Sequence, residues 1–273
     1  NHTKSEIGSR ISSQDIFDSI DIFDEPYSDP STVPSYILSK AISGTYKVAI
    51  SGDGGDELLG GYQRLNKTLS NKSQLTSSLS GLYDLYPPFL GTGNKFLSQS
   101  NNVEVSYPSY FEDLKLLKIL NLNPKNKFRE DYMGNTKNLY KELLISDYKL
   151  YLYEMMTHKI DRTSMANSLE VRSPFLDHRL IQYIFNSDNS YFDNSNPKKI
   201  LKTYLSEDFD DEFIYRKKQG FVFNLEGWVY ENLKIIEETI GDGFYIKNFN
   251  KNIVKTLSLK KSRINGHRIW KLF

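Results

Sequence analysis

The chain has 273 residues with 35 lysines and arginines against 34 aspartates and glutamates, a formal net charge of +1 that argues against nucleic acid or an anionic membrane as the main partner. Its hydrophobic fraction of 38% and charged fraction of 25% are ordinary for a globular protein with a substantial core, and no apolar run reaches the roughly 20 residues of a membrane-spanning helix. The sequence has no cysteine, which excludes disulfides and thiolate chemistry within this chain, and its polar start makes the cytoplasm the default location.

The first predicted elements are a loop, a helix and a strand. The segment FDEPYSDPSTVPSY, residues 23–36, contains three prolines and indicates a turn-rich loop. The segment SYILSKAISGT, residues 35–45, predicts a helix that ends at Gly44. The short run YKVAIS, residues 46–51, is too brief for a helix and predicts a strand buried on both faces. A helix followed by a strand and a glycine loop is the unit of a parallel α/β sheet.

The rest of the chain is predicted to be mostly helical. Residues 66–103 are rich in Ser, Asn and Lys and indicate irregular or weakly helical structure. Apolar residues recur at three- and four-residue spacing in YFEDLKLLKILN, residues 110–121, and again across residues 136–169. We therefore expect a sheet part at residues 1–65 and a largely helical part at 104–273.

The loop after the predicted strand, SGDGGDELLGGY at residues 51–62, is the strongest candidate for a functional site. Ligands of open α/β sheets bind beyond the carboxyl ends of the strands. The loop lacks the Gly-Lys-Ser/Thr ending of a Walker A motif, and Glu57 stands where a dinucleotide fingerprint needs its third glycine. A tight turn capped by aspartates is the plainer interpretation. Against it, Asp53 and Asp56 stand three residues apart beside glycine amides, a pattern suited to a magnesium-bound phosphate chain.

Four segments, in order, resemble the asparagine synthetase family. They are FDEPYSDPSTVP, SGDGGDELLGGY, KIDRTSMANSLEVRSPFLDHRL, and the pair KKILKTYL and KQGFVFNLEGW. Together they extend from residue 23 to about residue 230. The resemblance implies an α/β fold of the adenine nucleotide alpha-hydrolase-like (ATP-pyrophosphatase) type, with a parallel sheet and a largely helical carboxyl-terminal half.

Two parts of that family have no counterpart in this sequence. These are the first phosphate loop, Ser-Gly-Gly-x-Asp-Ser, and the amino-terminal glutaminase domain with its nucleophilic cysteine. The sequence is thus expected to be a partial synthetase domain with a truncated sheet. It would be inactive alone, with the missing glutaminase domain as its partner.

The resemblance implies a reaction and a set of site residues. ATP would activate a carboxylate as an acyl-adenylate, which ammonia derived from glutamine would convert to an amide. The implied cofactors are ATP and Mg²⁺, with Asp56 as the metal ligand. The catalytic residues implied are Asp53 and Lys198, and the ATP-binding residues implied are Ser51, Gly52, Gly54 and Lys218.

The acceptor remains open at this point. Aspartate, giving asparagine, is the first expectation. Asp53, however, occupies a position where the family's asparagine synthetases usually carry glutamate, and Asp29-Pro30-Ser31 replaces a common Arg-Ala-Ser run. The alternatives are another carboxylate, such as a surface-polysaccharide sugar acid, and a non-catalytic binding domain. A homodimer is left open.

Other charged residues of these motifs are expected to be structural. Asp161 with Arg162, and Glu170 with Arg172, are predicted to be buried partners that hold the site without taking part in the chemistry. Asp177 is expected to cap the helix that follows it.

Overall fold

The computed structural model describes residues 11–70, 82, 85–87, 103–120, 122, 127–187, 195–217, 220–221, 223–242 and 252–273. These residues divide into two units. Unit 1 takes those within 1–25, 31–69 and 129–221, and unit 2 takes those within 26–30, 70–128 and 222–273. Much of the segment 66–103, predicted to be irregular or weakly helical, lies outside the described residues.

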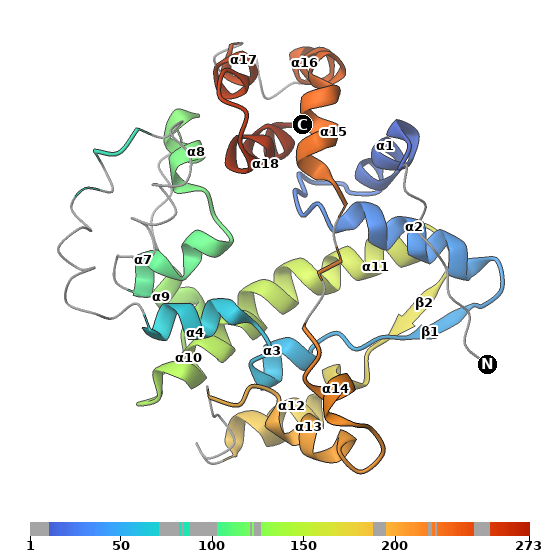
Figure 1. The fold of residues 1–273 in the computed structure, drawn as a ribbon, viewed down its shortest axis with the longest axis vertical. Helices are drawn as coiled ribbons and strands as arrows, with labels where there is room; N and C mark the ends of the chain where they lie inside the picture. Colours follow the sequence, from blue (N-terminus) through green and yellow to red (C-terminus); the bar gives the residue numbers. More distant parts are fainter. Residues whose placement is uncertain are drawn as a thin grey trace. The chain divides into compact units, whose positions relative to one another are not determined.

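Unit 1 contains a small parallel sheet, as the sequence predicted. Strands β1 (Val48–Ile50) and β2 (Glu170–Arg172) lie side by side with Val48 opposite Glu170 and Ile50 opposite Arg172 (Figure 1). The prediction that the first strand is buried on both faces was wrong. Within the described residues the sheet has two strands, and the side chain of Ile50 is 78% exposed.

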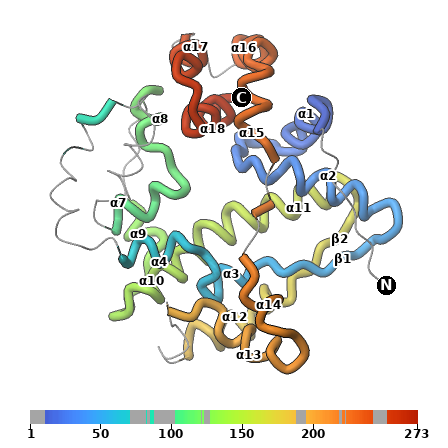
Figure 2. Tube along the Cα trace, viewed as in Figure 1, coloured from blue at the N-terminus to red at the C-terminus, as the bar shows by residue number. Residues whose placement is uncertain are grey.

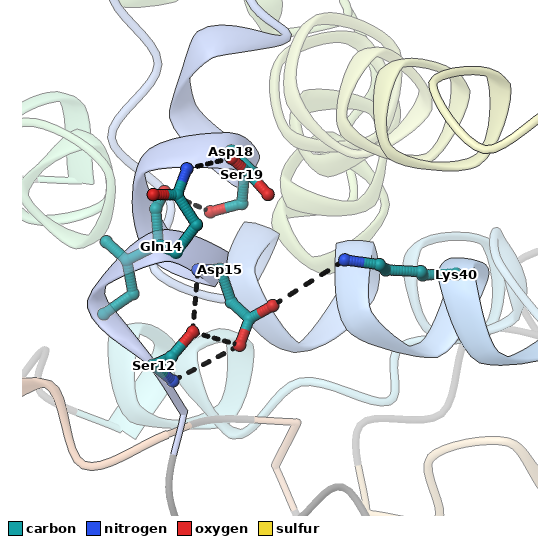
Figure 3. Close-up of polar contacts among 7 residues, drawn as sticks. Ser12, Gln14, Asp15, Asp18, Ser19 and Lys40 are labelled. Atoms are coloured by element: carbon teal, nitrogen blue, oxygen red, sulfur yellow. Dashed lines mark hydrogen bonds and ion pairs between the residues drawn. The ribbon is translucent and has the colours of Figure 1, made fainter.

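Two helices precede β1 in unit 1. Helix α1 (Ser13–Asp21), which the sequence did not predict, begins with a capping box in which Ser12 and Asp15 bond to each other's backbone amides (Figure 3). Its Asp15 carboxylate also lies 4.0 Å from Lys40 of helix α2 (Thr32–Ser43). The Asp15–Lys40 contact adds to the packing of α1 on α2.

The predicted end of α2 at Gly44 is confirmed, because Gly44 is its C-cap residue. The helix begins at Thr32, three residues earlier than the sequence indicated. It packs along α11 (Thr157–Met165), which also contacts β2.

A long helical stretch forms the centre of unit 1, confirming the helical pattern of residues 136–169. Helix α10 (Leu139–Ser146) continues into the π-helical segment η4 (Asp147–Met156) and then into α11, which Figure 2 shows as one continuous coil. The helical spacing gave no sign of the π-helical part. Side chains with at most 1% exposure mark the core around this stretch: Ile16, Val33, Leu58, Leu65, Leu143, Leu144, Leu152 and Leu169.

The other elements of unit 1 are short. They are α3 (Gly55–Leu59), α4 (Gln63–Ser70), η5 (Pro174–Leu176), α12 (His178–Asn186), α13 (Lys199–Leu205) and α14 (Asp211–Ile214), and α9 (Phe128–Tyr132) stands where the chain passes from unit 2 to unit 1. The predicted capping role of Asp177 is confirmed, since its carboxylate accepts a hydrogen bond from the backbone amide of Arg179 at the start of α12.

Unit 2 is helical in its described residues. Its elements are α7 (Val103–Ser106), η3 (Pro108–Tyr110), α8 (Leu114–Ile119), α15 (Leu225–Glu231), α16 (Leu233–Asp242), α17 (Ile253–Ser258) and α18 (Arg263–Leu272). Helix α18 packs on α15 and α17, and its Trp270 indole donates a 3.0 Å hydrogen bond to the carbonyl of Ser28. The turn-rich loop is thereby tied, through residues 26–30, to the carboxyl-terminal helices. Across the described ranges, none of the helices is long and apolar enough to cross a bilayer.

Candidate functional site

The glycine loop leaves the carboxyl end of β1, as predicted, and packs against the segment that leaves β2. Gly54 has a left-handed backbone with φ of +92°. A Cβ atom there would lie 2.7 Å from Leu176 Cδ2 and 3.2 Å from Phe175 Cβ. Glycine is required at this position for its backbone angle and for its lack of a side chain. The exits of both strands therefore meet in one place (Figure 2).

Helix α3 presents Asp56 in its first turn and ends at Gly60, whose φ is +73°. A Cβ atom on Gly60 would overlap the hydroxyl of Tyr140, which belongs to α10. The glycines at both ends of α3 thus let the short helix lie directly against its neighbours.

The carboxylate of Asp56 is paired with a lysine from far along the sequence. The Nζ atom of Lys198 lies 2.6 Å from Oδ1 of Asp56, and the two side chains are 33% and 21% exposed, respectively. The backbone amide of Lys198 also donates a 2.9 Å hydrogen bond to the carbonyl of Leu59 at the end of α3. Two of the residues implied by the family resemblance are therefore brought together by the fold.

Lys198 has a left-handed backbone, with φ of 60° and ψ of 26°, immediately before α13. This conformation is costly for a residue with a side chain and persists only where the surroundings impose it. In this conformation the amide of Lys198 bonds to the carbonyl of Leu59 in α3, and its ammonium pairs with Asp56.

Ser51, Gly52 and Asp53 occupy the start of the loop. The Oγ atom of Ser51 lies 2.5 Å from Oγ of Ser173, which follows β2. Gly52 is exposed, and a Cβ atom placed on it meets nothing within 4 Å, so the space beside it is open. Asp53 is half-buried in the turn before α3. Lys218, the remaining predicted site residue, lies outside the residues that the structure describes.

Behind the loop lies a buried polar network that local sequence patterns do not indicate. Glu57, only 3% exposed, accepts a 2.6 Å hydrogen bond from the hydroxyl of Tyr62. Burial raises the pKa of the Glu57 carboxyl, and the Tyr62 hydrogen bond offsets part of that rise. Burial, followed by the charge of Glu57, also raises the pKa of Tyr62. Burial therefore shifts the Glu57 carboxyl toward its protonated form, and the hydrogen bond from Tyr62 opposes this shift.

Arg64 joins this network to the π-helical segment. Its guanidinium lies 3.7 Å from the ring centroid of Tyr62 and 4.4 Å from that of Tyr151, and its Nη2 is 3.0 Å from the fully buried Asp147 carboxylate. Stacking and ion pairing together anchor the chain after α3 to η4. A local pattern could not indicate these contacts, because Arg64 and Asp147 are 83 positions apart.

The predicted structural pairs require two corrections. Arg162 pairs with Asp24 at 2.6 Å rather than with Asp161. Adjacent residues of a helix point in different directions, which disfavours the predicted pairing. Glu170 and Arg172 do pair, at 2.8 Å, but their side chains are 55% and 66% exposed instead of buried, because both lie on the open face of the small sheet.

Comparison with known proteins identifies similar sequences. The sequence model of a family described as asparagine synthase matches residues 1–271. The chain is 26% identical over 270 residues to glutamine-hydrolyzing asparagine synthetase 1 of Bacillus subtilis, covering 91% of this chain and 42% of that protein. A putative glutamine-hydrolyzing asparagine synthetase of Mycobacterium tuberculosis (strain H37Rv) is 26% identical over 229 residues, 76% of this chain and 34% of that protein. A probable one of Acanthamoeba polyphaga mimivirus is 29% identical over 143 residues, 49% of this chain and 26% of that protein. The chain spans less than half the length of each.

Proposed function

The chain belongs to the asparagine synthase family, and we propose that it provides the ATP-dependent ligase site of a glutamine-dependent, amide-forming enzyme. Its parallel strands and surrounding helices agree with the ATP-pyrophosphatase type of α/β fold that its motifs indicated. The proposed product is asparagine, formed from aspartate through an acyl-adenylate.

The observation that carries the proposal is the Asp56–Lys198 ion pair at the carboxyl end of β1. One charge comes from the glycine loop and the other from the residue before α13. A half-buried carboxylate beside an ammonium supplies the two charges that a phosphate chain and its counterion need. The open space beside Gly52 would let a ligand approach the loop backbone.

The arrangement suits a magnesium ion that is bound together with the nucleotide phosphates. The described residues contain no group of three His, Asp or Glu side chains that would hold a metal by themselves. Magnesium in nucleotide sites is commonly held by one or two carboxylates together with substrate phosphates, and Asp56 would supply one of these ligands. When bound, the ion neutralises charge on the phosphates.

The chain's own residues would then have distinct roles. Ser51, Gly52 and Gly54 would contact the nucleotide, and the Lys198 ammonium would stabilise negative charge on its phosphates. Asp53 would face the activated carboxylate and accept a proton from the incoming ammonia.

A second acceptor is favoured by one observation. Asp53 is one methylene shorter than the glutamate usual at this position, so its carboxylate reaches less far. A carboxylate other than aspartate, such as a sugar acid, is therefore the alternative substrate.

The test measures pyrophosphate release by the full-length protein that contains this chain, supplied with Mg-ATP, glutamine and a panel of acids. We expect aspartate to drive release, and a sugar acid acting in its place would support the second acceptor.

Lys198→Met should reduce the rate of pyrophosphate release about 100-fold or more, as loss of a preorganised charge does at other sites. Lys199→Met is the matched control, because Lys199 is the exposed neighbouring lysine, and it should leave the rate unchanged. No acid-dependent release from the wild type would refute the ligase proposal and support a binding role.

A further inference from the structure

Two serine hydroxyls meet where the two parallel strands end. Ser51 follows β1, Ser173 follows β2, and their Oγ atoms are 2.5 Å apart. The backbone amide of Ser51 donates a 2.9 Å hydrogen bond to the carbonyl of Arg172, which extends the strand ladder up to this point. Because the strands are parallel, both hydroxyls lie at the edge where ligands of such sheets bind.

The backbone at Ser173 is held by the pairing of β2 that precedes it and by the turn that follows it. Its carbonyl accepts a 2.9 Å hydrogen bond from the amide of Leu176, which closes the η5 turn. The side chains of Phe175 and Leu176 in that turn lie against Gly54 and Gly55 of the loop. A serine held this way can set the position of the Ser51 hydroxyl without moving itself.

The number of hydroxyl hydrogens limits which serine can donate within the pair. Each hydroxyl has one hydrogen, so only one of the two can donate within the pair, and the other keeps its hydrogen for a third group. Both serines are half-buried, so the free hydrogen is available at the edge of the site. An anionic oxygen that accepts from Ser51 would favour the arrangement in which Ser173 donates, because linked hydrogen bonds polarise one another.

We propose that Ser173 is a positioning residue of the nucleotide site: its hydroxyl donates to Oγ of Ser51, which in turn donates to a phosphate oxygen of ATP or of the acyl-adenylate. The inference rests on the proposed function and extends it, since it assigns to the exit of β2 a role in nucleotide binding. Under this scheme Ser173 acts only through Ser51.

A double-mutant cycle on the full-length protein tests this dependence, with the dissociation constant of Mg-ATP as the readout. Ser51→Ala should weaken binding about tenfold, the effect of losing one hydrogen bond to a charged group. Ser173→Ala should weaken it about threefold to fivefold in the wild-type background and not at all in the Ser51→Ala background. Ser173→Thr keeps the hydroxyl and should restore binding. Ser43→Ala, which removes a hydroxyl bonded to the carbonyl of Lys40 in α2, should leave binding unchanged.

Thermal unfolding of each variant separates this role from a structural one. A Ser173→Ala protein that unfolds at a lower temperature but binds Mg-ATP as the wild type does would overturn the inference and leave the proposed function intact. Equal losses of affinity from Ser173→Ala in both backgrounds would also overturn it. A wild-type protein that does not bind Mg-ATP would refute the proposed function itself, and this inference with it.

Discussion

Gly61 and Lys198 lie so close that a Cβ atom on Gly61 would overlap Cε of Lys198, and it would also overlap Oδ1 of Asp56. The absence of a side chain at Gly61 therefore makes room for the ion pair on which the proposed site depends. The second glycine pair of the loop, Gly60-Gly61, follows α3 and is not part of the turn at the end of β1. The contacts at Gly61 explain why one of these two residues lacks a side chain. Gly60 serves the packing on α10, and Gly61 serves the site.

Gly61→Ala should consequently disturb the site more than the fold. Gly61 does not have a left-handed backbone, so alanine causes no backbone strain there. The expected effect comes from the added methyl group, which would force the Asp56 carboxylate and the Lys198 ammonium apart. We expect pyrophosphate release by the full-length protein to fall about 100-fold, as displacements of about 1 Å can cause. Gly44→Ala is the matched control, because its Cβ would have its nearest contact at 3.9 Å and its φ of −62° suits alanine. Equal activity in the two variants would contradict the role given to Gly61.

Because Lys198 has a left-handed backbone, we expect glycine to be tolerated better than alanine at this position. At this position Lys198→Gly should be more stable than Lys198→Ala by about 1 kcal/mol, because glycine adopts positive φ without the penalty of a Cβ atom. At Lys202, in the middle of α13, the order should reverse by a similar amount, about 1 kcal/mol, because glycine is the poorer helix former. The measurement is urea unfolding of all four variants. The same order at both positions would show that the backbone of Lys198 is not strained.

Local sequence patterns predicted the parts of this protein that depend on neighbouring residues. Gly44 ends α2, Asp177 caps α12, and the glycine loop follows a strand, because each depends on a few consecutive residues. The meeting of Asp56 with Lys198 was not visible in spacing or composition, and the resemblance to the family supplied the two residues without their contact. It arises from the packing of α3 against the residue before α13.

The other differences between the predicted and the observed structure have related physical causes. The spacing of apolar residues does not distinguish a π-helical stretch from an α-helix, so the pattern over η4 predicts an ordinary helix. The strand was expected to be buried because of its β-branched residues, but burial depends on what covers the sheet. Arg162 pairs with Asp24, which is distant in sequence. It does not pair with its neighbour Asp161, because adjacent residues of a helix point in different directions.

The buried Glu57 predicts a dependence of stability on pH. Its pKa in the folded protein is raised above the ordinary value of 4.5, so the folded state holds the proton more tightly than the unfolded chain. Its contribution to stability is therefore greatest below pH 4.5 and declines as the pH rises toward the folded-state pKa. Glu57→Gln keeps an acceptor for Tyr62 and removes this titration.

We therefore expect the stability of Glu57→Gln relative to the wild type to increase as the pH rises from about 4 to 8. Urea unfolding at several pH values measures the difference. Glu238→Gln, at an exposed i,i+4 pair with Lys234, should show much less change over the same range. A difference between Glu57→Gln and the wild type that does not vary with pH would contradict the raised pKa.

The Arg268–Asp113 pair of unit 2 can be compared with an exposed ion pair that has the same two donor–acceptor distances. Arg268 is 2% exposed and makes two hydrogen bonds to Asp113, at 2.6 and 3.0 Å. Arg179 makes two to Asp177, at 2.6 and 3.0 Å, but its side chain is 81% exposed. Arg268→Met should lower the free energy of unfolding at pH 7 by about 3–5 kcal/mol, because it leaves a partly buried carboxylate without its partner. Arg179→Met should cost much less, because water replaces the lost partner.

The pH dependence of the Arg268→Met effect tests its cause. Burial alone would raise the pKa of the Asp113 carboxyl, but the hydrogen bonds and charge of Arg268 outweigh burial and hold that pKa below its ordinary value of 3.8. In the wild type, the contribution of Asp113 is therefore present above pH 3.8 and is lost as the pH falls through the lowered pKa. Without Arg268, the pKa of Asp113 should rise, because burial is then opposed only by the Leu116 amide and Lys271. Protonation at low pH should then remove the penalty. The difference between the two proteins should accordingly narrow as the pH falls from 7 to about 3, and Asp113→Asn should recover part of the stability lost in the Arg268→Met background. A difference that stays constant over this range would mean that lost packing, and not an unpaired charge, explains the destabilisation.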